Sequence, residues 1–210
     1  MWLLLFQLAC HQSNQGPTSF EEHYDNGPMA ILGQVDNNTP IGTWNEWHKN
    51  GQPKSTYHFL DGQEHGLRQS WYDNGQLAEQ GTFKFGLQDG TFSLWYADGT
   101  KQAETTYQKG VENGLRKTWY PNGQPKSEAQ IENGLQQGQR KFWHQNGPLK
   151  AQGMFVMDQR EGLEHTFDTN GTWVESHCYR LDVSQQVWQA SENDTQPTRC
   201  EDKSGGDATE

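Results

Sequence analysis

The chain has 210 residues, a formal net charge of −11 and only 31% hydrophobic residues, but it contains 23 Gly and 9 Trp. A compact globule of this length uses more Leu, Ile and Val, whereas the 12% of aromatic residues is more than disordered sequences contain. An acidic protein without a basic run is a poor match for nucleic acid or anionic lipid, because both are bound through Lys and Arg. The composition therefore predicts a thin structure with aromatic ridges.

The N-terminal segment is apolar and short. Seven of the eight residues from Trp2 to Ala9 are apolar, and a polar segment follows Cys10. This is too short for a membrane span, which takes about 20 residues, and is typical of a secretion signal. Leu8, Ala9 and Cys10 resemble a bacterial lipobox, although Gln7 departs from its pattern and no Lys or Arg precedes the run. We expect a lipobox segment at 1–10, lipidation of Cys10 and a polar tether at 11–19; the alternative is an apolar strand with a buried free cysteine.

Residues 20–174 repeat with a period of 24. The repeated features are a turn glycine, a second glycine and, five residues after the second, a large aromatic residue. The turn glycines are Gly27, Gly51, Gly75, Gly99, Gly123, Gly147 and Gly171; the second series is Gly42, Gly66, Gly90, Gly114, Gly138 and Gly162; the aromatic residues are Trp47, Trp71, Trp95, Trp119, Trp143 and Phe167. Such phasing indicates a repeat architecture.

Each unit is expected to form two strands and two turns. The second glycine opens the first strand, and an Asn-Gly or Asp-Gly pair makes a primed hairpin turn in which the glycine takes positive φ. The resulting fold class is all-β, an antiparallel hairpin meander of about twelve strands in an elongated twisted sheet of roughly 50–60 Å. A weaker period of 48 residues is also present: the residue after the second glycine is Leu67 and Leu115 in one set of repeats, and Thr43 and Thr91 in the other. This indicates either alternate packing of the hairpins or drift among copies.

The phrase GLRQSWYDNGQLAEQGTF and its copies resemble MORN repeats of the variant type found in bacterial YwqK-like antitoxin proteins. The resemblance covers about residues 18 to 175 and implies a hairpin scaffold that joins other proteins or sometimes lipids. It implies no catalytic residue, and the acidic charge weakens a lipid-binding role.

The sequence predicts neither a catalytic site nor a metal site, and no cofactor. Nucleophile motifs and metal-ligand spacings are absent, and His48 and His144 stand where other units have tyrosine. A candidate binding strip consists of Tyr72, Tyr96, Tyr120, His48, His144, Arg68, Arg116 and Arg140, which we place on one face by counting alternate residues. The alternative is that these side chains only pack the sheet.

The C-terminal part departs from the repeat. Residues 175–200 are expected to cap the last hairpin, and residues 201–210 to form a disordered acidic tail. In an exported protein Cys178 and Cys200 would form a disulfide, whereas in the cytoplasm both would be free thiols.

These features together predict a non-catalytic scaffold that binds a protein at the bacterial cell envelope, attached to the membrane only by the lipid. The alternatives are a cytoplasmic antitoxin-like regulator and a glycan-binding aromatic strip.

Overall fold

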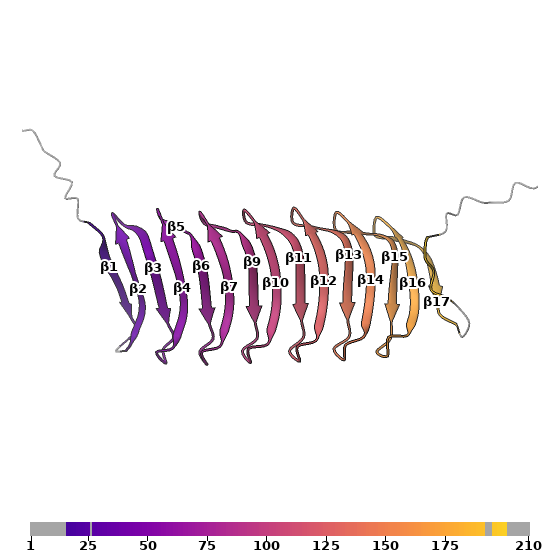
Figure 1. Ribbon diagram of the computed structural model, residues 1–210, viewed down its shortest axis with the longest axis horizontal. Coiled ribbons are helices and arrows are strands. Elements are labelled where there is room, and N and C mark those ends of the chain that lie inside the picture. The colour runs from indigo at the N-terminus through magenta and orange to yellow at the C-terminus, as the bar shows by residue number, and fades with distance from the viewer. Residues whose placement is uncertain (1–15, 26, 192–194, 201–210) are drawn as a thin grey trace, which may run out of the picture.

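The computed structural model describes residues 16–25, 27–191 and 195–200. The secondary structure of these residues is entirely β, in one open sheet of 17 strands whose two ends lie at opposite ends of an elongated body (Figure 1). The strands are β1 (Thr18–His23), β2 (Met29–Asp36), β3 (Thr39–Trp47), β4 (Pro53–Leu60), β5 (Gln63–Glu64), β6 (Gly66–Trp71), β7 (Leu77–Lys84), β8 (Leu87–Gln88), β9 (Gly90–Trp95), β10 (Lys101–Gln108), β11 (Val111–Trp119), β12 (Pro125–Glu132), β13 (Leu135–Trp143), β14 (Leu149–Val156), β15 (Gln159–Phe167), β16 (Trp173–Arg180) and β17 (Val183–Gln189). The predicted all-β hairpin meander is confirmed.

Neighbours in sequence are neighbours in the sheet. The pairing is antiparallel and follows the chain order: β4 pairs with both β5 and β6, β7 pairs with both β8 and β9, and the other strands pair with the next one. The sheet is longer than the twelve strands expected. It begins at Thr18, within the expected tether, and it continues through β16 and β17, so the expected boundary at 174/175 falls inside β16.

The turns form two rows of different geometry. In the Asn-Gly row, the Gly51 N–H donates to the His48 carbonyl at 2.9 Å and the His48 N–H to the Gln52 carbonyl at 2.8 Å. Here the glycine has positive φ, but Asn50 does not, so this is a type I turn closed by a left-handed glycine and not a primed turn. Primed turns occupy the opposite row, where two consecutive residues such as Asp61 and Gly62 have positive φ. The predicted place of the primed turns was therefore wrong.

Two glycines of the second series, Gly66 and Gly90, open a strand as expected, whereas in the other units the strand begins before the glycine. In β11 the strand begins three residues before Gly114, which has φ +127°. The register with β10 shifts opposite this position, between Thr105 and Tyr107. These glycines therefore lie in bulges, where a positive φ bends the strand and an ordinary side chain would be strained.

The buried residues lie mainly on one face. Five of them lie at strand positions whose side chains point to this face: Gly81, Phe92, Ala129, Ile131 and Phe155. Across the sheet, one strand position of this face is occupied in successive units by Trp44, Arg68, Phe92, Arg116, Arg140 and Glu164, which we call the central column. In several units this column lies directly opposite small residues, and its own residue changes from ring to charge between units.

Candidate functional site

The tyrosine and histidine side chains of the expected strip form a row of hydrogen bonds between successive repeats. Each ring reaches the next unit and donates a hydrogen bond to the backbone carbonyl of the aromatic residue 23 positions later. The bonds run from Tyr24 to Trp47 (2.7 Å), His48 to Trp71 (2.8 Å), Tyr72 to Trp95 (2.7 Å), Tyr96 to Trp119 (2.9 Å), Tyr120 to Trp143 (2.9 Å) and His144 to Phe167 (2.9 Å). The polar atoms of this row are therefore used within the fold, as the packing alternative expected.

The Asn-Gly turns are joined in the same way. The Asn74 amide donates to the Ala97 carbonyl at 2.7 Å, while its oxygen accepts the Gln76 N–H at 3.0 Å. Equivalent bonds begin at Asn50, Asn122 and Asn146, and Asp98 holds the same place in the remaining unit. Hence the recurring asparagine both shapes its own turn and fastens the next one, while Gly51, Gly75, Gly99, Gly123 and Gly147 supply the positive φ.

The structure separates the three arginines from the tyrosine row. Arg68 lies over the rings of Tyr57 and Phe83, with its guanidinium carbon 5.9 and 5.8 Å from the ring centroids. Arg140 lies 4.2 Å from the centroid of Phe142. The arginines thus stand in the middle of the strands, in the central column, whereas the tyrosines stand at the strand ends. The expected single strip does not form.

Acidic residues accompany two of these arginines. Arg68 pairs with Glu64 at 3.5 Å, and Arg116 pairs with Glu112, in both cases with the acid four residues earlier. Sequence analysis did not identify these glutamates, although their 48-residue spacing matches that of the arginines. Burial raises the pKa of Glu64, and Arg68 only partly offsets this effect.

Other units fill the central column with rings. A methyl group on Gly33 would overlap the Trp44 ring, and one on Gly81 would overlap Phe92. The Phe20 and Trp44 rings lie 5.1 Å apart, and Phe92 contacts Phe83 and Tyr107 at 5.4 and 5.3 Å. In the first four units, the weak 48-residue period therefore corresponds to an alternation of an aromatic ring and an arginine at the central-column position, which we also call the slot.

Glu46, beside Trp44 on β3, has a different environment from Glu64. Burial raises the pKa of Glu46, but hydrogen bonds from Lys54 and Tyr57 outweigh it and leave the pKa below its usual value. Burial and the neighbouring Glu46 raise the pKa of Tyr57, which keeps its hydroxyl protonated as a donor to Glu46 at 2.8 Å. These groups form a closed polar cluster and leave no free acid or base.

The tryptophan row Trp47, Trp71, Trp95, Trp119 and Trp143 is half-buried at the strand ends. Lys101 lies over two of these rings, with its ammonium 5.9 Å from Trp95 and 5.7 Å from Trp119. The register places Trp71 opposite Leu77 and Trp143 opposite Leu149. The row therefore packs against the start of the following strand.

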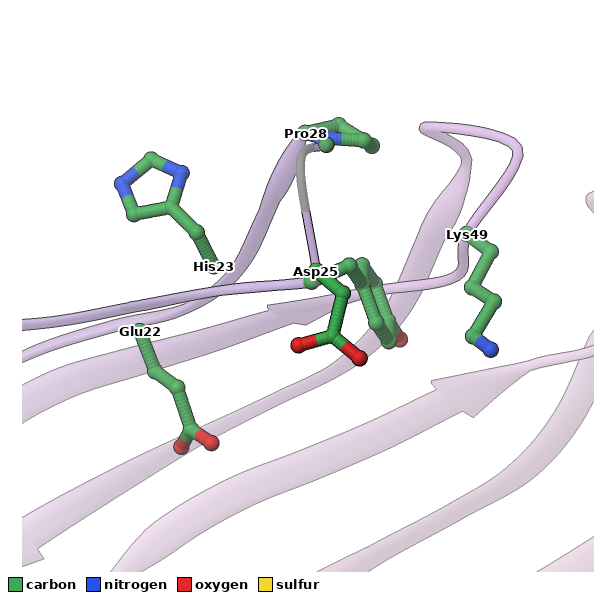
Figure 2. A pocket seen from close by; sticks show the side chains of 7 residues that line it. Glu22, His23, Asp25, Pro28 and Lys49 are labelled. Atoms are coloured by element: carbon green, nitrogen blue, oxygen red, sulfur yellow. The ribbon is translucent and has the colours of Figure 1, made fainter.

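A shallow hollow of about 420 Å³ lies at the first turn, lined by Glu22, His23, Tyr24, Asp25, Gly27, Pro28 and Lys49. Figure 2 shows that Glu22 and His23 point to opposite sides of the backbone and that Lys49 comes from the neighbouring turn. These side chains do not converge on one point. Among the described residues, no group of His, Cys, Asp or Glu is placed to hold a metal ion.

The C-terminal segment is held by a disulfide between Cys178 and Cys200, whose Cα atoms are 5.6 Å apart. Ser176, beside it on β16, is fully buried and accepts a hydrogen bond from the Trp173 ring at 2.8 Å. Cys10 and the acidic tail lie outside the described residues. None of the described segments forms a helix with the length and apolarity needed to cross a bilayer.

Comparison with known families gives a match to four segments of the repeat array. The family model described as MORN repeat variant matches residues 40–61, 64–85, 88–109 and 112–133. These four segments begin at successive steps of 24 residues and include the central-column positions from Trp44 to Arg116. No curated protein matches the sequence.

Proposed function

We propose that this MORN-repeat protein is a non-catalytic scaffold that binds a protein partner through its central column at the bacterial cell envelope. The observation that carries the proposal is the set of three partly exposed arginines, Arg68, Arg116 and Arg140, at one position of a sheet that the turn bonds hold in register. Arginine beside aromatic rings is the combination that most often dominates binding energy in protein interfaces.

The spacing of the column supports an extended contact. Equivalent residues of successive units are two strands apart, which corresponds to about 10 Å. Because every unit keeps the same register, the three guanidinium groups lie along one line of the face and can contact one partner together. The net charge of −11 makes nucleic acid an unsuitable partner for this face.

Photo-crosslinking from two matched leucines tests the binding face. Leu94 follows Phe92 by two residues and shares its face, whereas Leu115 precedes Arg116 and points to the opposite face. They are 38% and 37% exposed, so a benzoylphenylalanine replacing either one is equally accessible. In the native host we expect a discrete protein adduct from Leu94 and none from Leu115. Adducts from Leu115 alone, or equal adducts from both, would contradict the proposed face.

The envelope location rests on two cysteine features. The Cys178–Cys200 disulfide supports an oxidising compartment, because such bonds are rare in the cytosol. The lipobox resemblance at Leu8 to Cys10 supports attachment through lipid. A fatty-acid analogue should label the wild-type protein and leave Cys10→Ala unlabelled; an unlabelled, soluble wild type would reject the anchor. The antitoxin-like and glycan-binding alternatives stay predictions.

A further inference from the structure

Arg140 lies between two small residues in the central column. The strand register sets it opposite Ala129 on β12 and Gly153 on β14, which are both buried. The two residues directly opposite Arg140 are therefore small and carry no polar side chain that could pair with the guanidinium. The same guanidinium lies on Phe142, and its second ring contact is Phe155 at 5.6 Å.

Arg140 also lacks the acidic residue that its counterparts have. Arg68 and Arg116 each pair with a glutamate four residues earlier, but the residue four before Arg140 is Gln136. The Gln136 amide oxygen is buried without a hydrogen-bond partner, so it does not compensate the guanidinium. Within residues 16–25, 27–191 and 195–200, no carboxylate lies within ion-pair distance of Arg140.

A second arginine lies close to this cation. Ala129 is directly opposite Arg116 on one neighbouring strand and opposite Arg140 on the other. Burial, together with repulsion from Arg116, lowers the pKa of Arg140, and Glu164, which pairs with Arg160 at 3.6 Å, only partly offsets this. A partly buried cation without a direct ion pair is unfavourable, and an external anion would relieve that cost.

We propose that Arg140 receives a carboxylate from an acidic segment of the protein partner, bound above Ala129 with Arg116 on its other side. A guanidinium that lies flat on a ring presents its N–H edge, and this edge matches the two oxygens of a carboxylate. The inference rests on the proposed function for the identity of the partner as a protein. The carboxylate belongs to an Asp, a Glu or the C-terminal residue of the partner.

N-acetylglutamate is a suitable probe, with N-acetylglutamine as its uncharged control. The arginine Nε–Hε signals of the full-length protein, with its disulfide intact, are followed by NMR during the titration, and Arg140→Lys assigns the signal of interest. We expect a saturable shift at Arg140, a smaller one at Arg116 and almost none at Arg68. Equal shifts at all three arginines, or equal shifts with N-acetylglutamine, would overturn the proposal.

Two glutamine variants make the test specific. Gln136→Glu places an acid where Glu64 and Glu112 stand in other units, so it should pair with Arg140 and weaken binding of the probe by about fivefold or more. Gln88→Glu makes the same change in the unit of Phe92, where no arginine follows, and should leave binding unchanged. Unchanged binding in Gln136→Glu, or an equal loss in both variants, would reject the site.

Inorganic phosphate distinguishes the alternative anion. If phosphate shifts the Arg140 signal at lower concentration than N-acetylglutamate does, the site selects phosphate and the acidic segment is the wrong occupant. This experiment needs no natural partner. A failed titration alongside a Leu94-specific adduct would reject only the carboxylate site, whereas a positive titration without the adduct would reject only the proposed function.

Discussion

The units with a ring in the central column and the units with an arginine share one backbone but differ in what that slot does. In the Phe92 unit the ring lies over Gly81 and contacts two further rings, so the slot is closed. In the Arg140 unit Ala129 takes the place of this glycine and in the Arg116 unit Thr105 does, and the slot holds a charge. The backbone bonds at the turns are common to both kinds of unit. The comparison therefore separates what the repeat needs for folding from what it can vary for binding.

The largest effect is expected from filling the glycine of a ring unit. In Gly81→Ala the new methyl group would overlap the Phe92 ring, which is buried and cannot move freely. We expect a loss of about 1–3 kcal/mol in the free energy of unfolding, measured by urea denaturation. Gly153→Ala is the matched control, since its nearest neighbour is the Glu164 side chain at 3.3 Å and its φ is not positive.

A compensating change makes this prediction more specific. The double variant Gly81→Ala, Phe92→Arg reproduces the pair that Ala129 and Arg140 form. It should recover part of the lost stability if the slot accepts either pair. If the double variant is less stable than Gly81→Ala alone, ring units and arginine units are not interchangeable and the comparison fails.

The turn bonds test the part that the two kinds of unit share. Tyr72 belongs to the Arg68 unit and Tyr96 to the Phe92 unit, and each donates to the next tryptophan carbonyl. Replacing either with Phe removes one hydrogen bond and keeps the ring, so each variant should lose about 1 kcal/mol. The same urea assay measures the loss in the free energy of unfolding for both variants. If the loss in one variant is more than twice the loss in the other, the hydrogen bonds depend on the residue in the central column.

The sequence was sufficient to predict the period, the strand class and the antiparallel meander, because Gly75, Trp71 and their copies recur without an insertion. It did not predict which side chains meet. Counting alternate residues placed Arg68 and Tyr72 in one strip, but Arg68 lies in the middle of β6, whereas Tyr72 lies beyond its last residue and donates to the Trp95 carbonyl of the next unit.

The ion pair of Glu64 and Arg68 was missed for a related reason. In an extended strand, residues four apart are separated by about 13 Å, which is too far for a salt bridge. Gly66 lies between them with φ +94°, and the bulge that it makes brings the two charges to 3.5 Å. A count along one extended strand therefore could not bring Glu64 and Arg68 together.

A smaller effect is expected at the one Asn-Gly turn that lacks the asparagine. Asp98 accepts the Thr100 N–H at 2.8 Å, as the asparagines do from their own following residues, but a carboxylate has no donor for the next turn. Asp98→Asn should add a bond to the Pro121 carbonyl, 23 residues later, and raise the urea midpoint by less than Tyr72→Phe lowers it. Asn74→Asp is the reverse control. A lower midpoint in Asp98→Asn would show that the amide bonds do not stabilise the array.

The smallest effect concerns pH and compares a ring unit with an arginine unit directly. The Glu46 and Glu64 side chains are both 19% exposed, so a difference in exposure does not explain their opposite pKa shifts. The lowered pKa of Glu46 means that its contribution to stability is present above its unfolded pKa and is lost as the pH falls through its folded pKa. The raised pKa of Glu64 means that its contribution is present below its unfolded pKa and is lost as the pH rises through its folded pKa.

The two glutamine variants should therefore change the pH profile in opposite directions. Between pH 7 and pH 3.5, Glu46→Gln should reduce the acid-induced loss of stability, and Glu64→Gln should increase it, each by about 0.5 kcal/mol. Unfolding free energies at the two pH values give this difference directly. Lys54 and Tyr57 donate to Glu46, whereas Glu64 pairs only with Arg68 and its second oxygen is buried without a partner. If both variants change the pH dependence of stability in the same direction, these contacts do not set the two pKa values.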